Sequence, residues 1–282
     1  MAVPYKAPVK DIVFGYEVID SYNVLNKISA FSDFSEDIVI PTMEECAKFS
    51  EEVLAPINAI GDQQGATIKD GVVTMPEEFV DAYQKFAEAG WASISLPSDI
   101  GGGGMPITLS GGTLEILSTA NLAFGLAPGL SAGAISAINF HGSQEQKDKF
   151  LPKLVSGEWT GTMNLSEPQS GSDLGTITTK AEPQEDGSYK ITGTKVWITF
   201  GEHNMTENII HLVLAKVPGS PEGTKGISMF IVPKYTVNDD GSVGDSNNVS
   251  CISIEEKLGI HASPTCVMEY DGSVGYLVGE EN

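Results

Sequence analysis

The chain has 282 residues, a formal net charge of −22, and sixteen basic residues that are all lysine. A surface this acidic repels nucleic acid. Because the chain has no arginine, it cannot bind a phosphate through the two parallel hydrogen bonds of a guanidinium group. Hydrophobic residues, 41% of the total, suffice for one large domain or two modest ones, and no window approaches the roughly 20 apolar residues of a membrane span.

Apolar residues recur at helical spacing up to about residue 158. Ser35 is placed to cap a helix that Pro41 is expected to break or reset, and the next helix runs from Thr42 to Ile57. Proline and acids at 76–78 open another helix. Gly90 is expected to end it. Further helices are expected over 109–123, 130–140 and, from a capping box at 143–146, up to about Gly157.

From Glu158 onward the pattern changes to short β-rich runs separated by turn residues. Strands are expected over 159–165, 175–182, 188–199, 209–217, 227–232, 249–255 and 265–270. Repeated short strands at this spacing are typical of an antiparallel barrel or sandwich. The fold class is therefore α+β, with an all-helical domain over 1–158 and a β-domain over 159–282.

The cysteines and the N-terminus indicate a cytoplasmic protein. Cys46, Cys251 and Cys266 are far apart and form no C-x-x-C pair, which argues against a disulfide framework and against a zinc site. Small buried residues are the simpler interpretation. The first six residues lack the basic-then-apolar pattern of a secretion signal.

The stretch 163–175, M-N-L-S-E-P-Q-S-G-S-D-L-G, contains the residues most suited to bind a ligand. A strand ends there, Pro168 prevents its continuation, and a loop of glycines and hydroxyl residues follows. Such a loop exposes backbone donors and lets a bulky ligand approach closely. On composition alone, a polar turn between strands is the commoner case.

Two motifs resemble the paired signature of acyl-CoA dehydrogenases. The first is L-S-E-P-x-x-G-S-D-x-G at 165–175, with Ser166 where the family typically has threonine, and the second is G-x-K-x-W-I-T at 193–199. Further matches follow in family order at 141–146, 150–158, 257–263 and 275–280. The resemblance spans nearly the whole chain and implies that the β-domain is an antiparallel β-barrel.

A narrower resemblance points to one branch of this family. Residues 5–14, 201–208 and 260–266 are similar to the branch that includes 3-methylmercaptopropionyl-CoA dehydrogenases. That branch oxidises a thioester formed in bacterial breakdown of dimethylsulfoniopropionate. The resemblance implies FAD-dependent α,β-dehydrogenation of this or another short acyl-CoA, with electrons passed to an electron-transfer flavoprotein and a homo-oligomeric full-length enzyme.

The resemblance also implies which residues bind. The segment before Pro168 would line the flavin ring, Gly171 and Ser172 would face phosphate and thioester, and the end of the second motif would pack on the ring and bond near its N5. The implied FAD-binding residues are Met163, Leu165, Ser166, Gly171, Ser172, Trp197, Ile198 and Thr199, with Ser172 also binding substrate.

Simpler interpretations stand beside these roles. Trp197 is a candidate core aromatic, and Ser166 and Ser172 are candidate turn serines. Glu167 is expected to bond loop amides and not to act as an acid. The isolated His141, His203 and His261 are expected to be structural or surface residues, and the glycine run 101–104 is expected to be a flexible turn without a Rossmann pattern.

Removal of the α-proton of a thioester requires a positioned base. In the family a glutamate of the C-terminal helical domain does this, so the resemblance places the base beyond Asn282 and implies that the 282 residues alone are inactive. No catalytic residue and no metal ligand are therefore expected within them. An acyl-CoA oxidase and a non-catalytic flavin- or acyl-CoA-binding module remain the alternative functions.

Overall fold

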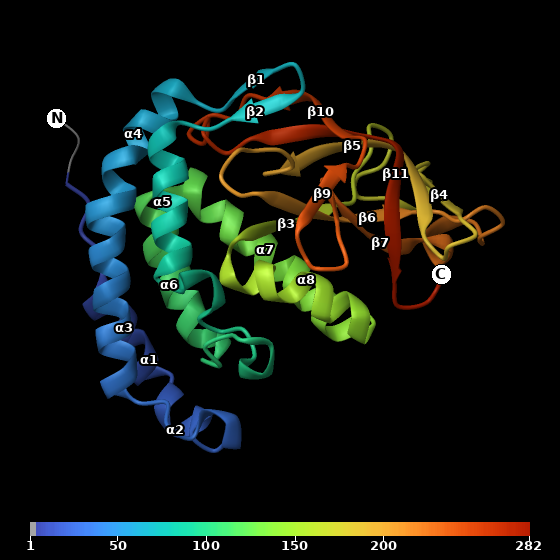
Figure 1. The fold of residues 1–282 in the computed structure, drawn as a ribbon. Coiled ribbons are helices and arrows are strands. Elements are labelled where there is room, and N and C mark those ends of the chain that lie inside the picture. Colours follow the sequence, from blue (N-terminus) through green and yellow to red (C-terminus); the bar gives the residue numbers. More distant parts are fainter. Residues whose placement is uncertain (1–3) are drawn as a thin grey trace.

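A helical part precedes a β-rich part in the computed structural model, which describes residues 4–282 (Figure 1). Residues 1–3, at the start of the segment without a secretion pattern, lie outside the described residues. The α-helices are α1 Val9–Val18, α2 Ser21–Leu25, α3 Glu36–Phe49, α4 Ala55–Gln64, α5 Glu77–Glu88, α6 Ile107–Ala120, α7 Leu122–His141 and α8 Gln144–Ser156. The α+β prediction is confirmed.

The strands form one large mixed sheet and two small hairpins. They are β1 Thr67–Lys69, β2 Val72–Thr74, β3 Trp159–Asn164, β4 Lys180–Pro183, β5 Tyr189–Thr199, β6 Asn208–Ala215, β7 Ser228–Pro233, β8 Tyr235–Val237, β9 Val243–Ser246, β10 Val249–Glu255 and β11 Thr265–Val278. The β1–β2 hairpin, which turns through Asp70 and Gly71 at positive φ, means that the first part is not all helical.

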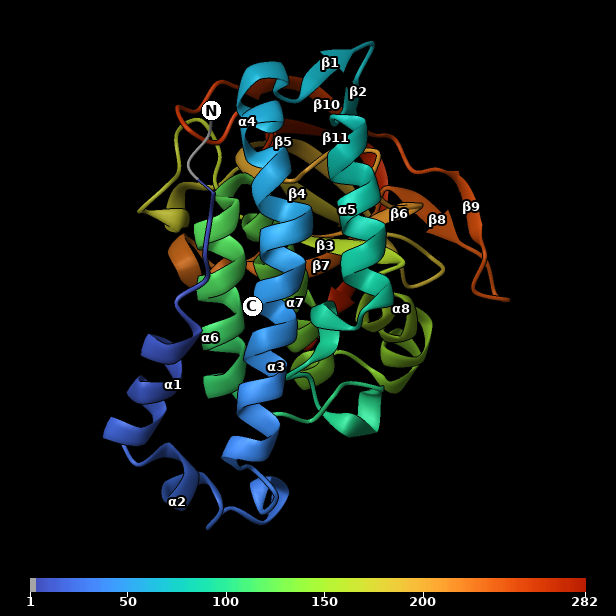
Figure 2. The same cartoon turned by 90° about the vertical axis from the view of Figure 1, so that its left-hand side faces the viewer.

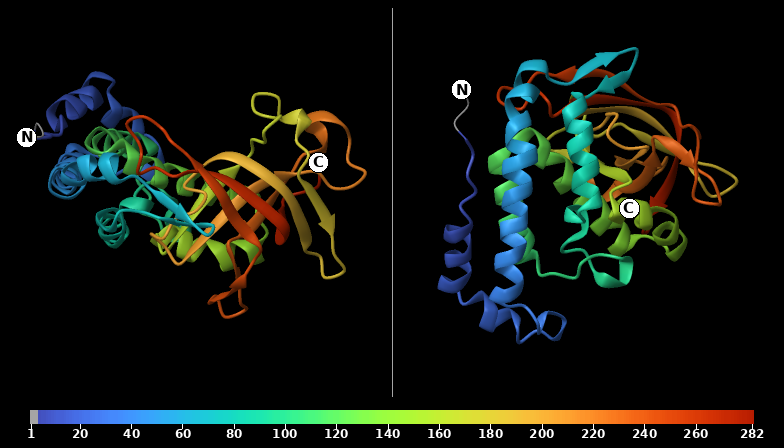
Figure 3. Two further views of the ribbon diagram at one scale, coloured as in Figure 1. Left: turned by 90° about the horizontal axis from the view of Figure 1, so that it is seen from above. Right: turned by 60° about the vertical axis from the view of Figure 1, so that its left-hand side comes forward.

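The large sheet has the order β3-β6-β7-β11-β5-β4, with β10 on β11. Its ladders are antiparallel except for β3 and β6, which pair in parallel from Trp159↔Asn208 to Asn164↔Val213. The expected antiparallel barrel is therefore corrected in two respects: the sheet is mixed, and it does not close into a barrel. Figure 3 shows this twisted sheet on one side of the helices.

Pro41 does not break its helix, contrary to the sequence prediction. α3 runs through it and continues by a π-helical turn, Ser50–Leu54, directly into α4. Proline removes only one backbone donor in the second turn, while Val39, Met43 and Cys46 are fully buried along the same helix. Burial of this apolar face outweighs the local cost of the proline.

α7 corrects the expectation that no segment is apolar enough for a membrane span. By length and composition it has the character of a spanning helix, but 44% of the residues in its apolar window are buried. It packs against α6, α8 and β3 between the outer helices and the sheet (Figures 1 and 2). These contacts are those of a core helix.

α8 begins and ends as its sequence predicts. Ser143 and Gln146 form a capping box, and Gly157 ends the helix with a φ of +81°. The Gln146 side chain also donates to the Leu277 carbonyl at the end of β11, 2.7 Å away. The cap therefore fixes α8 to the sheet as well as starting the helix.

The glycine run 101–104 is held by hydrogen bonds and is not a flexible turn. Gly102, Gly103 and Gly104 donate to the carbonyls of Pro97, Ser93 and Leu96, each at 2.9 Å. A Cβ on Gly102 would lie 2.2 Å from the Leu96 carbonyl oxygen. Glycine is needed here because two backbone segments pack against each other.

Candidate functional site

The candidate site begins where β3 ends. After Asn164 the chain leaves the sheet, and Glu167 and Ser170 exchange two backbone hydrogen bonds of 2.8 and 2.9 Å across Pro168. This small turn starts a loop that extends to Thr179. Leu165 and Ser166 lie half-buried just before the turn, at the edge of the sheet.

A β-bulge shapes the second half of the site, at the end of β5. Ile198 and Lys195 pair with Cys266 and Met268 of β11, so that two residues of β5, Val196 and Trp197, lie opposite one residue of β11. Trp197 has a φ of +59°, a rare conformation for a bulky side chain, and its side chain is 54% exposed. The bulge directs the ring into solvent, so Trp197 is not the core aromatic of the simpler interpretation.

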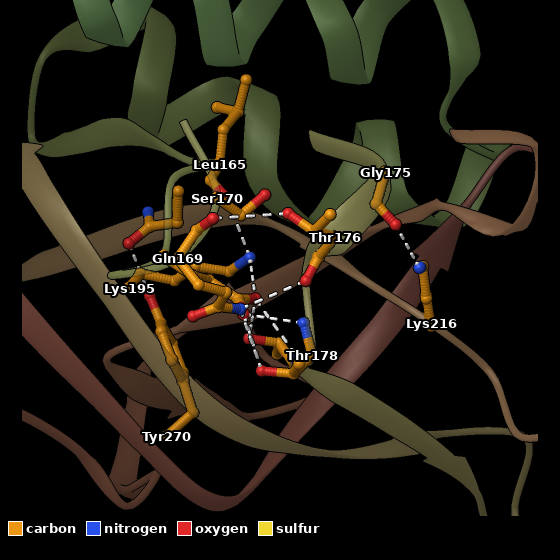
Figure 4. A network of polar contacts seen from close by, with 12 residues as sticks. Leu165, Gln169, Ser170, Gly175, Thr176, Thr178, Lys195, Lys216 and Tyr270 are labelled. Carbon is orange, nitrogen blue, oxygen red and sulfur yellow. Dashed lines mark hydrogen bonds and ion pairs between the residues drawn. The ribbon is translucent and has the colours of Figure 1, made fainter. Parts of the chain in front are cut away.

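Backbone and side-chain bonds bring these two halves together. The Val196 amide donates to the Ser166 carbonyl at 2.9 Å. The Lys195 ammonium donates to the Leu165 carbonyl at 3.0 Å and to Glu167 Oε1 at 2.9 Å (Figure 4). The two sequence motifs, which lie about thirty residues apart, therefore lie side by side.

Glu167 is the centre of this arrangement. Its carboxylate accepts six hydrogen bonds, from Gln169, Lys195 and both the amide and the hydroxyl of Thr178 and of Thr179, at 2.6 to 3.0 Å. Figure 4 labels three of these partners, Gln169, Thr178 and Lys195. Burial raises the pKa of Glu167, but these bonds outweigh it and bring the pKa to about 2. The predicted structural role, bonding loop amides, is confirmed.

The partner lysine is equally buried, with 0% of its side chain exposed. Burial lowers the pKa of Lys195 from its ordinary value, and the neighbouring carboxylate partly offsets this. The six donors around Glu167 favour its carboxylate form, and the two acceptors of Lys195 favour its ammonium form.

The remaining predicted residues occupy three different environments. Gly171 and Ser172 lie exposed on the loop, and a Cβ on Gly171 would meet nothing within 4 Å. Met163 packs partly buried toward the cluster shared with α7 and α8. Ile198 is 2% exposed in the core of the sheet, so only its backbone can face a ligand, and Thr199 is half-buried beside Thr265.

Beneath the site, the interior face of β3 carries a chain of polar groups. Tyr270 donates its hydroxyl to Asn164 Oδ1 at 2.8 Å, and Asn164 Nδ2 donates to Thr162 Oγ1 at 2.8 Å. Thr162 Oγ1 in turn lies 2.7 Å from His211 Nδ1. Burial lowers the pKa of His211 to about 3, so the ring carries no charge at neutral pH.

The histidines named from the sequence are structural or exposed. His203 is 1% exposed, accepts from the Met205 amide and contacts Thr160 Oγ1 at 2.9 Å, and burial lowers its pKa to about 3. His261 lies 2.8 Å from the Asp62 carbonyl. His141 lies exposed at the end of α7. The interpretation against catalytic histidines is consistent with all three positions.

The described residues form no disulfide and no cluster of potential metal ligands. Within residues 4–282 no group of three or more histidine, cysteine, aspartate or glutamate side chains is arranged to hold a metal ion. Cys46, Cys251 and Cys266 are free and buried, as the sequence interpretation expected.

Sequence reasoning missed the supporting residues of the site. Lys195 lies within the second motif, directly before the apolar residues Val196, Trp197 and Ile198, and the sequence interpretation assigns it no role. Such a lysine, with an acidic residue in the preceding loop motif, is a usable signal for a buried ion pair, since lysine is rarely fully buried without a partner. Thr178 and Thr179 carried no comparable signal.

Two family models match consecutive parts of the chain. The model described as "Acyl-CoA dehydrogenase, N-terminal domain" matches residues 41–158, and the one described as "Acyl-CoA dehydrogenase, middle domain" matches residues 162–273. The first match covers most of the helical part and the second covers most of the β-rich part.

Similar proteins give the same result. A 3-methylmercaptopropionyl-CoA dehydrogenase of Ruegeria pomeroyi is 46% identical over 99% of this chain and 47% of its own length. A butyryl-CoA dehydrogenase of Syntrophomonas wolfei is 38% identical over 98% of this chain and 46% of its own. The chain therefore spans about half the length of these curated relatives.

A solved structure resembles the fold as well. The crystal structure of an acyl-CoA dehydrogenase complexed with FAD from Bacillus anthracis has a TM-score of 0.70 and 26% identity, and it covers 89% of this chain and 38% of that one. The likeness includes the helical part and the sheet together.

Proposed function

Because the chain belongs to the acyl-CoA dehydrogenase family, with its N-terminal and middle domains, we propose that the protein catalyses FAD-dependent α,β-dehydrogenation of an acyl-CoA thioester. One observation carries the proposal. The Val196–Ser166 hydrogen bond sets the two motif segments side by side, and the bulge leaves the Trp197 ring exposed next to them. This arrangement offers a flat aromatic face beside a loop rich in backbone donors.

The residues present fit a flavin dinucleotide. A ring system can stack on Trp197, and the open backbone at Gly171 and the exposed Ser172 hydroxyl suit a phosphate or a thioester chain. The chain has no arginine, so backbone amides, hydroxyls and lysines must provide its anion contacts. Bound FAD would supply the hydride acceptor.

The chain's own residues orient and shield the reacting centre. Leu165, Ser166 and Trp197 form the proposed wall for the ring, and Thr199 and the Ile198 backbone provide polar groups at the strand end. A hydride acceptor must be held at a fixed distance from the substrate β-carbon, and groups at the ends of paired strands move less than groups on a free loop.

Glu167 is not the base that removes the α-proton. Six donors saturate its carboxylate, and a group with a pKa of about 2 accepts a proton poorly at neutral pH. We expect the base to lie beyond Asn282, as the family resemblance implies.

The substrate proposed is 3-(methylthio)propanoyl-CoA or another short acyl-CoA. The support is the 46% identity to the Ruegeria pomeroyi relative together with the branch motifs. A thioether sulfur is soft and weakly polar, so an apolar pocket accepts it nearly as it accepts a methylene. The proposal includes electron transfer to an electron-transfer flavoprotein, a cytoplasmic location and a homo-oligomer.

The whole gene product, reconstituted with FAD, tests the reaction. We expect dye-linked oxidation of 3-(methylthio)propanoyl-CoA and butanoyl-CoA with efficiencies within the range that one methylene-sized difference allows, about 1–3 kcal/mol. Palmitoyl-CoA should be a poor substrate. A preference for palmitoyl-CoA would refute the short-chain assignment, and rapid oxygen consumption without dye would favour an oxidase.

Absence of bound FAD in the reconstituted gene product would count against the site itself. Trp197→Ala should reduce flavin content, read from the absorbance of flavin released on denaturation. Flavin content equal to that of the wild type would show that Trp197 is not part of the flavin-binding wall.

A further inference from the structure

We propose that the buried Glu167–Lys195 pair is the positioning pair of the flavin wall, which sets the loop after β3 and the bulged end of β5 at the spacing that FAD requires. This inference rests on the proposed function. It assigns a role to two residues that would touch neither the flavin nor the substrate.

The connectivity of Glu167 is the first argument. One carboxylate joins three segments: its own turn after β3, the loop end at Thr178 and Thr179, and β5 through Lys195 (Figure 4). Each of the eight candidate FAD-binding residues lies within five positions of Glu167 or Lys195 in the sequence. A shift of this carboxylate would therefore change the spacing between Leu165 and Ser166 on one side and the bulged end of β5 on the other.

The burial of the pair is the second argument. Its side chains are 2% and 0% exposed, so both charges are removed from water. An apolar pair of similar volume often gives the same or greater stability. A contribution to stability is therefore a weak explanation for the presence of a buried ion pair at this position. The charged pair also fixes the position of the Lys195 side chain, because its ammonium must donate both to Glu167 Oε1 and to the Leu165 carbonyl.

Backbone strain beside the pair is the third argument. Trp197, two residues after Lys195, has a φ of +59°, a conformation that persists only when its surroundings hold it. The Lys195 bonds and the Val196–Ser166 hydrogen bond fix the strand on the N-terminal side of the bulge. Without the lysine, the bulge can relax and the ring can leave its position.

A second buried ion pair provides a matched control. Glu202 and Lys234 lie 2.5 Å apart with side chains 3% and 17% exposed, and they join the turn after β5 to the end of β7. Neither side chain bonds to the loop 165–179 in the part of the chain described. Substitutions there remove a similar interaction from the same sheet.

The test compares Lys195→Met/Glu167→Met with Lys234→Met/Glu202→Met. Each apolar double variant avoids leaving a buried charge alone, so thermal stability should stay near that of the wild type. We expect the first variant to bind FAD about tenfold more weakly and to shift the flavin absorption band, as loss of a supporting shell does. The control should keep the wild-type FAD affinity and spectrum.

A flavin-independent signal separates this inference from the proposed function. With 5-fluorotryptophan incorporated, the ¹⁹F resonance of Trp197, assigned through Trp197→Phe, should move in the Lys195/Glu167 variant and stay fixed in the control. If wild-type protein binds no FAD but this resonance moves, the positioning role stands and the proposed function fails. An unmoved resonance with unchanged FAD affinity would overturn the inference.

A milder variant keeps the test valid should the double variant fail to fold. Thr179→Val removes the 2.6 Å hydroxyl bond to Glu167 and leaves both charges paired. It should change FAD affinity and the Trp197 resonance in the same direction, by a smaller amount. Wild-type values for both, in folded protein, would contradict the positioning role.

Discussion

At a φ of +59°, Trp197 adopts a conformation that costs a bulky residue about 1–3 kcal/mol, yet its ring is too exposed to recover this by burial. Asparagine tolerates the same conformation. We expect Trp197→Asn to raise the free energy of unfolding by about 0.5–1 kcal/mol, with reduced flavin content. Urea denaturation measures the first and flavin absorbance the second.

Phe200 provides the comparison for this prediction. Its φ is +52°, but its side chain is 2% exposed and packs in the helical core cluster. Phe200→Asn should therefore lower the free energy of unfolding by about 3–5 kcal/mol, because lost packing exceeds relieved strain. If both variants lose stability equally, the conformation of Trp197 does not destabilise the fold, and the strain argument for a binding site at Trp197 fails.

The lowered pKa of Glu167 predicts that the free energy of unfolding depends on pH. Its folded-state pKa of about 2 lies below the ordinary value of 4.5, so its stabilisation is present above about pH 4.5 and is lost as the pH falls toward 2. The difference corresponds to about 3 kcal/mol. Glu167→Gln should lose about this much at pH 7 and flatten the stability curve between pH 4.5 and 2, as measured by urea denaturation.

A carboxylate in a more exposed pair is the control. Glu51→Gln affects the pair with Lys6, whose side chain is 83% exposed. The bonds from Lys6 and from the Ala7 amide lower the pKa of Glu51, but solvent screens this pair, so Glu51→Gln should change the acid limb of the stability curve less than Glu167→Gln. An acid limb that keeps its wild-type shape in Glu167→Gln would contradict the assignment to Glu167.

At the scale of elements, α8 gives a direct test of capping. Ser143→Ala removes the hydroxyl that accepts from the Gln146 amide and should cost about 1 kcal/mol, whereas Ser143→Gly should cost only a few tenths. Gln146→Ala should cost more than an ordinary cap residue, since it also loses the bond to Leu277. Chemical denaturation of the three variants checks the order; equal losses for alanine and glycine at position 143 would exclude capping.

α8 also shows why some elements were predictable from sequence. Its start, its apolar face and its final glycine all depend on residues close together in the chain. The prediction for Pro41 was wrong because burial of the apolar face of α3 decides the outcome there. The prediction for the glycine run was wrong because its amides bond to carbonyls five to ten residues earlier, a pairing that no sequence pattern indicates. The parallel β3–β6 pair has no local signal at all.

The candidate site was predictable only in part for the same reason. Its two motif segments were found as sequence, but no spacing rule places Ser166 beside Val196. Nor does a sequence show that Ile198 faces the core while Trp197 faces solvent, because a bulge interrupts the alternation of the strand. The functional assignment of these residues stays a prediction.

For the whole molecule, the net charge of −22 predicts that salt stabilises the fold. Acidic residues outnumber lysines by 38 to 16, and mutual repulsion of surface charges is screened as ionic strength rises. The Tm should therefore increase between 10 mM and 0.3 M NaCl, measured by circular dichroism. An uncharged osmolyte of equal osmolality serves as the control, and a Tm that falls with NaCl would refute the prediction.

The parallel pairing of β3 with β6 has a consequence for synthesis on the ribosome. β3 leaves the ribosome together with the helices it packs on, but the partner of Asn164 is Val213, 49 residues later. At about 5–20 residues per second, the nascent chain carries an unpaired strand edge for roughly 2–10 s. Translation speed across residues 165–213, and chaperone occupancy during that interval, should therefore govern how much of the protein reaches the native state.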